Sequence, residues 1–344
     1  MSAATQADKR ISGYERNAMS VSDLIRLMSD GAFHSGEALG REVGVSRTAI
    51  WKQLRKLEGL GLSVETARGC GYRLLNPPEP LRGADIVANL SRPARQCLKH
   101  LFVEDSTGST NTFVLERFAQ GAGHGEVCLA EWQSAGRGRR GRSFYSEWGG
   151  NIHFSIGWQF ESGVGALEGL SLAVGVIMAD LLSERGIDIQ LKWPNDLLVS
   201  TASGMSKLGG ILVEVRGDTS GPCQVVIGIG VNVRLSEKGR AGIEQSVTTL
   251  SDLAPDISRN ALVSAMIEAH MQMLGRFEET GFTAWHDRWN DYHVYRNRPV
   301  QIYQGSTVSE GMAKGVDDTG NLIVSIDGED KRFAGGEVSL RGRS

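Results

Sequence analysis

Four arginines and three glycines lie within residues 133–142, which read Gln-Ser-Ala-Gly-Arg-Gly-Arg-Arg-Gly-Arg. Guanidinium groups offer forked donors to carboxylate or phosphate oxygens, and glycines let the backbone approach a ligand closely. The flanking residues predict a loop between two strands, so the segment could fold over a polyanion and become ordered on binding. The literal GxGxxG match does not predict a dinucleotide site, because residues 143–146 do not resemble the start of a helix. The alternative is a solvated basic loop.

Four further segments place polar groups beside glycines or at the ends of strands. Residues 192–197, Lys-Trp-Pro-Asn-Asp-Leu, end a strand with a lysine for a phosphate and, in Asp196, a carboxylate for Mg²⁺; a simple turn is the alternative. Lys207 opens an apolar strand with paired glycines, where an exposed edge charge is the alternative. Residues 228–233, Gly-Ile-Gly-Val-Asn-Val, predict a buried strand with glycines at alternate positions, which either form the floor of a pocket or pack against a helix. Residues 105–111 are rich in hydroxyls before a helix, which favours an N-cap or ligand contacts equally.

The composition excludes several classes of protein. The 344 residues carry 37 basic and 40 acidic side chains, so any nucleic-acid contact requires a local patch rather than a generally basic chain. The most apolar stretch, 164–182, is interrupted by Glu168 and Asp180, and the N-terminus lacks a secretory pattern, which argues against a membrane partner. The four dispersed cysteines form no CxxC pair, which favours a reducing cytoplasm over disulfides or zinc.

The periodicity of apolar residues predicts an α+β chain with several domains. Three short helices and a two-stranded wing predict a winged helix-turn-helix; mixed strands and helices predict an α/β sheet; short strands separated by turns predict a small barrel. The expected order is a flexible leader (1–19), the winged helix-turn-helix (20–76), a proline-rich linker (77–94), the mixed domain (95–295) and the barrel (296–344).

The third predicted helix, residues 46–57, is basic and carries no acid. Its N-terminal end lies where a recognition helix meets bases, and the wing turn could reach phosphates or the minor groove. Because one winged helix gives limited affinity, we expect a dimer on a two-part operator. The alternative is a docking domain with a solvated basic face. The predicted DNA-binding residues are Ser46, Arg47, Thr48, Trp51, Lys52, Arg55 and Arg68.

In their order along the chain, these motifs resemble those of the biotin protein ligases: Ser-Thr-Asn at 109–111, then GRGRRGR, KWPNDL, KLGGILVE and GIGVNV. The resemblance spans about residues 100–340, and the winged helix extends it to the bifunctional type, in which the ligase also represses transcription. It implies a central domain resembling class II aminoacyl-tRNA synthetase cores and an SH3-like C-terminal barrel. The related lipoate ligases carry a different signature, a run of glycines followed by His-Asp, which this sequence does not contain. Ser106 and Thr107 remain possible substitutes for Ser109 and Thr110.

The resemblance implies a two-step reaction that uses biotin, ATP and Mg²⁺. Biotin and ATP form biotinyl-5′-AMP and pyrophosphate, and a lysine of biotin carboxyl carrier protein then attacks the mixed anhydride and releases AMP. Biotinyl-5′-AMP also promotes a homodimer that binds operator DNA. The implied catalytic residues are Lys207, Arg137, Arg139, Lys192 and Asp196, with Asp196 also the Mg²⁺ ligand. The implied biotin-binding residues are Ser109, Thr110, Asn111, Gln133, Arg137, Gly138, Arg139, Trp193 and Lys207, with Trp193 as a wall of the apolar pocket. The implied nucleotide-binding residues are Arg140, Arg142, Lys192, Asn195 and Asn232.

The sequence is compatible with three other interpretations. The chain could be a ligand-sensing transcription factor with an inactive ligase core, although every charged residue of the core motifs is present. It could also be a ligase whose N-terminal domain has no operator function, which only DNA binding can decide. A metal site is the weakest alternative, because His286 and His293 are seven residues apart and no His/Cys cluster has ligand spacing.

Overall fold

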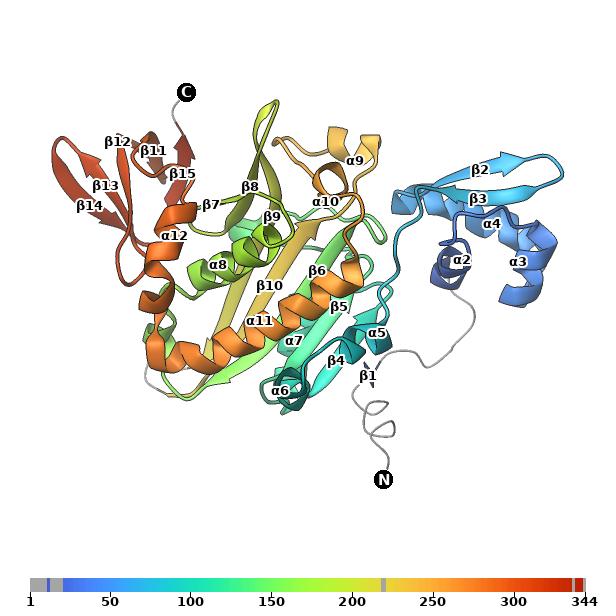
Figure 1. Ribbon diagram of the computed structural model, residues 1–344, viewed down its shortest axis with the longest axis horizontal. Helices are drawn as coiled ribbons and strands as arrows, with labels where there is room; N and C mark the ends of the chain where they lie inside the picture. Colours follow the sequence, from blue (N-terminus) through green and yellow to red (C-terminus); the bar gives the residue numbers. More distant parts are fainter. Residues whose placement is uncertain (1–10, 13–20, 218–220, 336–337, 343–344) are drawn as a thin grey trace.

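The computed structural model describes residues 11–12, 21–217, 221–335 and 338–342. It arranges them as a winged helix-turn-helix at one end, a large mixed sheet in the middle and a small antiparallel sheet at the other end (Figure 1). The predicted leader lies outside the described residues, except for Ile11–Ser12. This architecture confirms the predicted α+β class.

The first unit is a winged helix-turn-helix. Ser35 and Ser46 begin its second and third helices by accepting hydrogen bonds from the backbone N–H groups of Ala38 and Ala49, and Gly44 follows the second helix at φ 69°. The predicted caps, helices and wing are confirmed. The elements are α2 Val21–Leu27, α3 Gly36–Val43, α4 Arg47–Leu57, η1 Glu58–Leu60, β2 Ser63–Ala67 and β3 Gly71–Leu75.

An eight-stranded sheet forms the central unit, in the order β1-β4-β5-β6-β10-β9-β8-β7. The pairs β1–β4 and β4–β5 are parallel, and every other pair is antiparallel. The sequence does not predict strand β8, because after β7 the chain reverses at once into a hairpin instead of leaving the sheet. The strands are β1 Ile11–Ser12, β4 His100–Glu104, β5 Glu126–Ala130, β6 Asn151–Phe160, β7 Ile189–Lys192, β8 Asp196–Thr201, β9 Gly204–Gly217 and β10 Cys223–Asn232.

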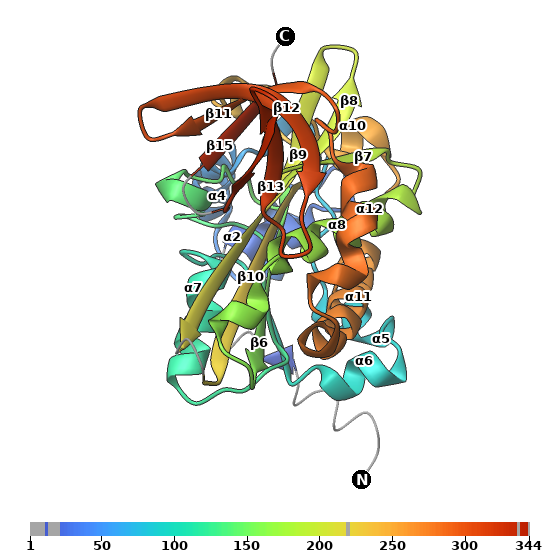
Figure 2. The ribbon, with the colours of Figure 1, turned by 90° about the vertical axis from the view of Figure 1, so that its left-hand side faces the viewer.

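Helices cover both faces of this sheet. Figures 1 and 2 together show α7 on one side of β6 and β10, with α8 and α11 on the other side. Gly157 of β6 permits the close approach of α7, because a Cβ there would lie 2.7 Å from Val114 and 2.8 Å from Phe118. The helices are α5 Gly83–Ala88, α6 Arg92–Cys97, α7 Thr110–Ala119, α8 Leu170–Ser183, α9 Glu237–Ala241, α10 Leu250–Leu253, α11 Arg259–Thr280 and α12 His286–Tyr292, with short 3₁₀ turns η2 Arg139–Gly141, η3 Val164–Leu167 and η4 Phe282–Trp285.

The most apolar helical stretch, Val164–Ser183, is long and apolar enough to cross a membrane by composition alone. Ten residues of α8 within it are buried, and the helix packs against α11 and the sheet. Its composition is therefore that of a core helix.

Part of the stretch predicted to be a linker, 77–94, is folded. It contains α5 and the start of α6, which pack against α11. Leu81, Ile86 and Leu90 are buried in the main core. Tertiary packing therefore overrides the proline-rich signal from residue 83 onward, although the predicted domain limits themselves stay predictions.

The winged helix-turn-helix and the central unit share buried side chains. Trp148 precedes β6 but belongs to the buried cluster of the winged helix, where 2% of its surface is exposed. Its backbone N–H donates to Leu60 at 2.9 Å. Arg26 of α2 donates to Asp105 at 2.6 Å, at the start of the hydroxyl-rich segment. The winged helix-turn-helix is thus tied to the end of β4, which leads into that segment.

The C-terminal unit is a five-stranded antiparallel sheet in the order β14-β13-β12-β11-β15. Helix α12 joins it to the centre, because Asn290 accepts from the backbone N–H of Val316 at 2.9 Å. The strands are β11 Pro299–Gln304, β12 Thr307–Val316, β13 Leu322–Ile326, β14 Glu329–Phe333 and β15 Val338–Gly342.

Candidate active site

One cavity gathers residues from all of the motifs singled out in the central domain. It lies where the start of β6, the start of β9 and the end of β10 meet the first turn of α7 and the arginine-rich loop. It encloses about 60 Å³, whereas ligand pockets span roughly 300–1,000 Å³. The site is therefore closed in this conformation. It is lined by Ser109, Thr110, Asn111, Gln133, Arg137, Gly138, Phe144, His153, Phe154, Asn195, Lys207, Gly210, Ile211, Leu212, Gly228, Ile229 and Gly230.

The glycines of β10 make room for groups that enter the cavity. Gly228 lies directly under the side-chain amide of Asn111, and a Cβ at Gly230 would lie 2.7 Å from the ring of Phe144. Both interpretations of these alternating glycines are therefore partly right, since one faces a helix and the other floors the cavity. Phe144 fills the space above Gly230 in the closed state.

Lys207 and Asp196 form an ion pair at the edge of the cavity, with Nζ 2.6 Å from Oδ1. A β-bulge lies beside Lys207, because the register between β8 and β9 shifts at Leu197 and Leu198. Bulges commonly re-aim a side chain next to a functional site. Gly210 lies beside the pair, where a Cβ would lie 3.5 Å from Nζ of Lys207 and 3.7 Å from Oδ1 of Asp196.

Positive charge concentrates behind this ion pair. Burial lowers the pKa of Lys192, and the charges of Lys207, Arg341 and Arg142 lower it further, while Asp196 opposes them. Four charged groups from β8, β9, β15 and the arginine-rich loop thus act on the ammonium of Lys192, which lies on β7. Clustered cations of this kind attract anions and suit the phosphates of a nucleotide.

The arginines of the loop point in different directions. Arg137 faces the cavity, where it donates to Thr112 at 2.9 Å and approaches Glu214 at 3.4 Å. Arg139 points away, donating to the carbonyl of Gly335 in the C-terminal unit and, at 3.4 Å, to Asn195. Burial lowers the pKa of Arg139.

The last two arginines of the loop, Arg140 and Arg142, are exposed at the surface. Neither Arg140 nor Arg142 lines the cavity.

Two predicted ligand residues are instead engaged within the protein. Trp193 does not line the cavity: 2% of its surface is exposed, and its indole N–H donates to the carbonyl of Gly320 at 3.1 Å. In this conformation the C-terminal unit packs against this face of the hairpin and engages the indole, so the expectation that Trp193 walls the apolar pocket stays a prediction. Asn232 is also buried, bonded to Asn151 at 3.2 Å and to the carbonyl of Thr248 at 3.4 Å. The apolar residues that line the cavity in this conformation are Phe144, Phe154, Ile211, Leu212 and Ile229.

The doubled Ser-Thr pair separates into two environments. Ser109 and Thr110 are buried and line the cavity, whereas Ser106 and Thr107 are absent from its described lining. Sequence reasoning missed His153, which also lines it. The available signal was the alternation of polar residues along β6, which places Asn151, His153 and Ser155 at every second position of a buried strand.

Carboxylates are too sparse here to build a metal centre from protein alone. Among the described residues, no group of three or more His, Cys, Asp or Glu side chains could hold a metal ion. Asp196 offers one carboxylate, already paired with Lys207. A single carboxylate fits a Mg²⁺ ion whose other ligands are substrate phosphates and water.

Comparison with known proteins agrees with this geometry. The profile of the biotin/lipoate A/B protein ligase family matches residues 103–232, an HTH domain matches 22–73, and the biotin protein ligase C-terminal domain matches 296–341. The bifunctional ligase/repressor BirA of Escherichia coli is 37% identical over 92% of this chain and 96% of its own length, and that of Salmonella typhimurium is 39% identical over the same shares. The chain belongs to the bifunctional ligase/repressor family.

A solved structure of the wider group shares the fold. The biotin protein ligase from Aquifex aeolicus in complex with biotin and ATP has a TM-score of 0.59 and 26% identity, covering 72% of this chain and all of that chain. A bifunctional ligase/repressor requires a DNA-binding unit beyond that shared part, and α2–β3 supply it here.

The recognition helix of this family member presents the predicted side chains to the outside. Arg47, Thr48, Trp51, Lys52 and Arg55 are all exposed. The ring of Trp51, 47% exposed, lies under the guanidinium of Arg55 at 4.7 Å.

The cap and the wing complete this surface. The hydroxyl of Ser46 is used as the helix cap, and Arg68 is exposed at the wing turn. Arg73, on the other side of the wing turn, pairs across the wing with Glu65 at 2.7 Å.

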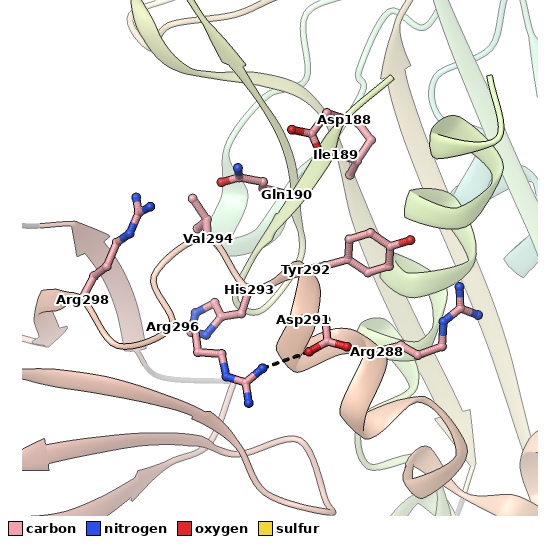
Figure 3. A pocket seen from close by; sticks show the side chains of 10 residues that line it. All are labelled: Asp188, Ile189, Gln190, Arg288, Asp291, Tyr292, His293, Val294, Arg296 and Arg298. Carbon is pink, nitrogen blue, oxygen red and sulfur yellow. Dashed lines mark hydrogen bonds and ion pairs between the residues drawn. The ribbon is translucent and has the colours of Figure 1, made fainter. Parts of the chain in front are cut away.

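A larger cavity of about 540 Å³ lies at the joint between β7, α12 and the C-terminal unit (Figure 3). Arg296 there pairs with Asp291 at 3.0 Å, as the dashed line in the figure marks. His293 lines it, but none of the predicted biotin, nucleotide or DNA residues does. Size alone would therefore select a cavity without the ligase motifs.

Proposed function

We propose that this chain is an ATP-dependent biotin protein ligase that forms biotinyl-5′-AMP, transfers biotin to a lysine of biotin carboxyl carrier protein, and represses biotin synthesis genes with the adenylate as corepressor. The observation that carries the proposal is the convergence of Lys207, Arg137, Gln133 and the first turn of α7 on one cavity beside a cationic cluster. Ligase activity and a DNA-binding unit follow from the family.

The first step joins two anions, a carboxylate and a phosphate, so it needs positive charge more than covalent help. Lys207 would leave Asp196 and neutralise the reacting oxygens, while Lys192 and Arg142 contribute to the field on the phosphates. Asp196, once released, would hold Mg²⁺ together with ATP. That ion would supply further neutralisation of phosphate charge.

The remaining roles follow the position of each side chain. Ser109, Thr110, Asn111, Gln133, Arg137 and Gly138 would bind biotin, since all line the cavity. Asn195 would bind the nucleotide, with Arg140 and Arg142 at the surface of the loop. Trp193 and Asn232 would act by holding their segments in place.

The closed cavity gives the arginine-rich loop a second role. Biotin cannot enter about 60 Å³, so the loop or Phe144 must move before binding. Closing again would keep water from the mixed anhydride until the acceptor lysine arrives. The hydrogen bonds of Arg139 to Gly335 and Asn195 support its assignment to the closed lid.

Two tests address the ligase. Pyrophosphate exchange into ATP is measured with biotin, with lipoate and with neither; exchange that requires biotin is expected. Lys207→Gln should abolish it, whereas Lys314→Gln, at an exposed site on β12, should not. No exchange from folded protein would favour the ligand sensor with an inactive core.

The repressor activity is tested separately. We expect biotin with ATP to promote formation of a homodimer and to increase the affinity for two-part operator DNA. The protein would carry out this function in the cytoplasm. A monomer at high concentration by sedimentation would contradict the dimer. Loss of operator binding with intact exchange would favour a ligase without operator function.

A further inference from the structure

We propose that His153 is a positioning residue that fixes the orientation of the Gln133 side-chain amide toward the ligand. The inference rests on the proposed function only for the identity of that ligand. His153 lies on β6 and Gln133 follows β5, so two neighbouring strands of the sheet present them side by side.

The backbone N–H of Thr110 determines which way the side-chain amide of Gln133 is turned. The N–H of Thr110 lies 2.7 Å from the amide of Gln133. Because a backbone N–H can only donate, the atom facing it must be Oε1. The hydroxyl of Thr110 donates to the same oxygen at 3.1 Å. The other end of the amide is therefore Nε2, which can only donate.

The orientation of this amide in turn fixes the tautomer of His153. Nε2 of Gln133 lies 3.0 Å from Nδ1 of His153, so Nδ1 must accept and carry no proton. The proton of the neutral ring is then on Nε2, which lies 2.8 Å from the hydroxyl of Ser146 and donates to it. The same hydroxyl accepts from the backbone N–H of Gln133 at 3.0 Å, which closes the ring of hydrogen bonds.

The surroundings of His153 keep this arrangement in place. Its side chain is 1% exposed, and the ring of Phe144 meets it edge-on at 5.9 Å. Burial, together with the charge of Arg259, lowers the pKa of His153 to about 3. A protonated ring would direct an N–H at the N–H of Gln133, so the neutral form is the one that fits.

The result is an amide held at both ends. Oε1 is committed to Thr110, and one hydrogen of Nε2 is committed to His153. No other described residue accepts the second amide hydrogen, and Gln133 lines the cavity. The site therefore offers a fixed donor to a hydrogen-bond acceptor on the ligand, such as the oxygen of a cyclic urea.

The test compares two buried histidines of the same domain. His153→Phe keeps the ring and removes both nitrogens; His270→Phe does the same on α11, where His270 is fully buried and bonded to the carbonyl of Met266. In pyrophosphate exchange, His153→Phe should raise the KM for biotin about tenfold, the effect of one lost, unreplaced hydrogen bond, with little change in kcat or the KM for ATP. His270→Phe should leave all three near wild type.

Two further variants separate positioning from packing. His153→Asn can place an amide oxygen near the site of Nδ1 and should recover most of the biotin KM. Ser146→Ala removes the acceptor that fixes the proton on Nε2, so it should raise the biotin KM by a smaller factor. In the double variant His153→Phe/Ser146→Ala, the factor added by Ser146→Ala should be smaller than in wild type, because only the bond from the backbone N–H of Gln133 to Ser146 is then left to lose. If His153→Phe does not fold, the biotin KM of Ser146→Ala still tests the hydrogen-bond network.

A readout independent of activity is the tautomer of His153, seen by ¹⁵N NMR of histidine-labelled protein. The Nε2–H form is expected between pH 6 and pH 8, and it should be lost or mixed in Ser146→Ala. An Nδ1–H form in the wild type, or an unchanged biotin KM in folded His153→Phe, would overturn the assignment. Wild-type protein with the Nε2–H tautomer but no biotin-dependent exchange would instead count against the proposed function and leave the network standing.

Discussion

Replacing Trp148 by alanine should loosen the winged helix-turn-helix, although Trp148 lies more than seventy residues beyond the end of its wing. Its indole is 2% exposed in a cluster that includes Leu24, Ile50 and Leu57. Truncating a buried Trp or Phe to Ala costs about 3–5 kcal/mol. Because the cluster lies under α2 and α4, that loss should fall on the winged helix rather than on the large sheet.

Phenylalanine at the same position should do much less harm. Within the part of the chain that the structure describes, the indole N–H of Trp148 has no hydrogen-bond partner, and an unpaired buried donor costs about 1–3 kcal/mol. Trp148→Phe removes that unpaired donor, which stabilises the fold, and removes part of the buried apolar surface, which destabilises it. The free energy of unfolding should therefore change by less than about 1.5 kcal/mol.

Hydrogen exchange followed by mass spectrometry can distinguish these outcomes. In Trp148→Ala, protection of α4 should fall by about a hundredfold or more, the equivalent of 3 kcal/mol, while α8 keeps its protection. Trp51→Ala is the matched control, since Trp51 lies on α4 but is 47% exposed. Equal losses in α8 and α4, or none in α4, would refute the shared-core argument.

Three further predictions concern stability and retention. Burial lowers the pKa of His153, His270 and His293 to about 3, 4 and 3, so the unfolded chain takes up protons below pH 6.5 that the folded protein does not, and stability should fall as pH falls. Urea unfolding at pH 7.5 and pH 5.5 should show His270→Phe losing about 1.4 kcal/mol less than wild type over that interval; an identical loss would contradict burial of a neutral ring. Arg259→Ala strips the partner from buried Glu131, 2.9 Å away, and should lower the free energy of unfolding by about 3–5 kcal/mol, whereas a loss below 1 kcal/mol would show that Glu131 is protonated or hydrated. Arg139→Gly should release biotinyl-5′-AMP and label a bystander protein such as serum albumin, and unchanged labelling would remove Arg139 from the lid.

The elements with strong local signals could be predicted from the sequence. Ser35, Ser46 and Gly44 mark the limits of α3 and α4 because capping acts within a few residues. The long helix α11 and the core helix α8 follow from length and apolar content. The motifs around Gln133, Lys207 and Gly228 do meet at one cavity, because they lie on strands that end at the same edge of one sheet.

The features that the sequence does not predict depend on contacts between residues that are distant in the sequence. Helices α5 and α6 are six residues each and owe their place to packing on α11. The direction of Trp193 is decided by the C-terminal unit, which local sequence does not specify. His153 looks like any histidine in an apolar strand until Thr110 and Gln133 are placed beside it.

The C-terminal unit touches the ligase motifs through main-chain oxygens. The carbonyl of Gly320 accepts from Trp193, and that of Gly335 accepts from Arg139. A carbonyl is present whatever the side chain, so substitutions along these turns can accumulate without breaking either contact. A single insertion or deletion between β12 and β13, or between β14 and β15, would displace the oxygen. Variation in loop length, rather than in residue identity, should therefore be the change that natural selection removes from this part of the chain.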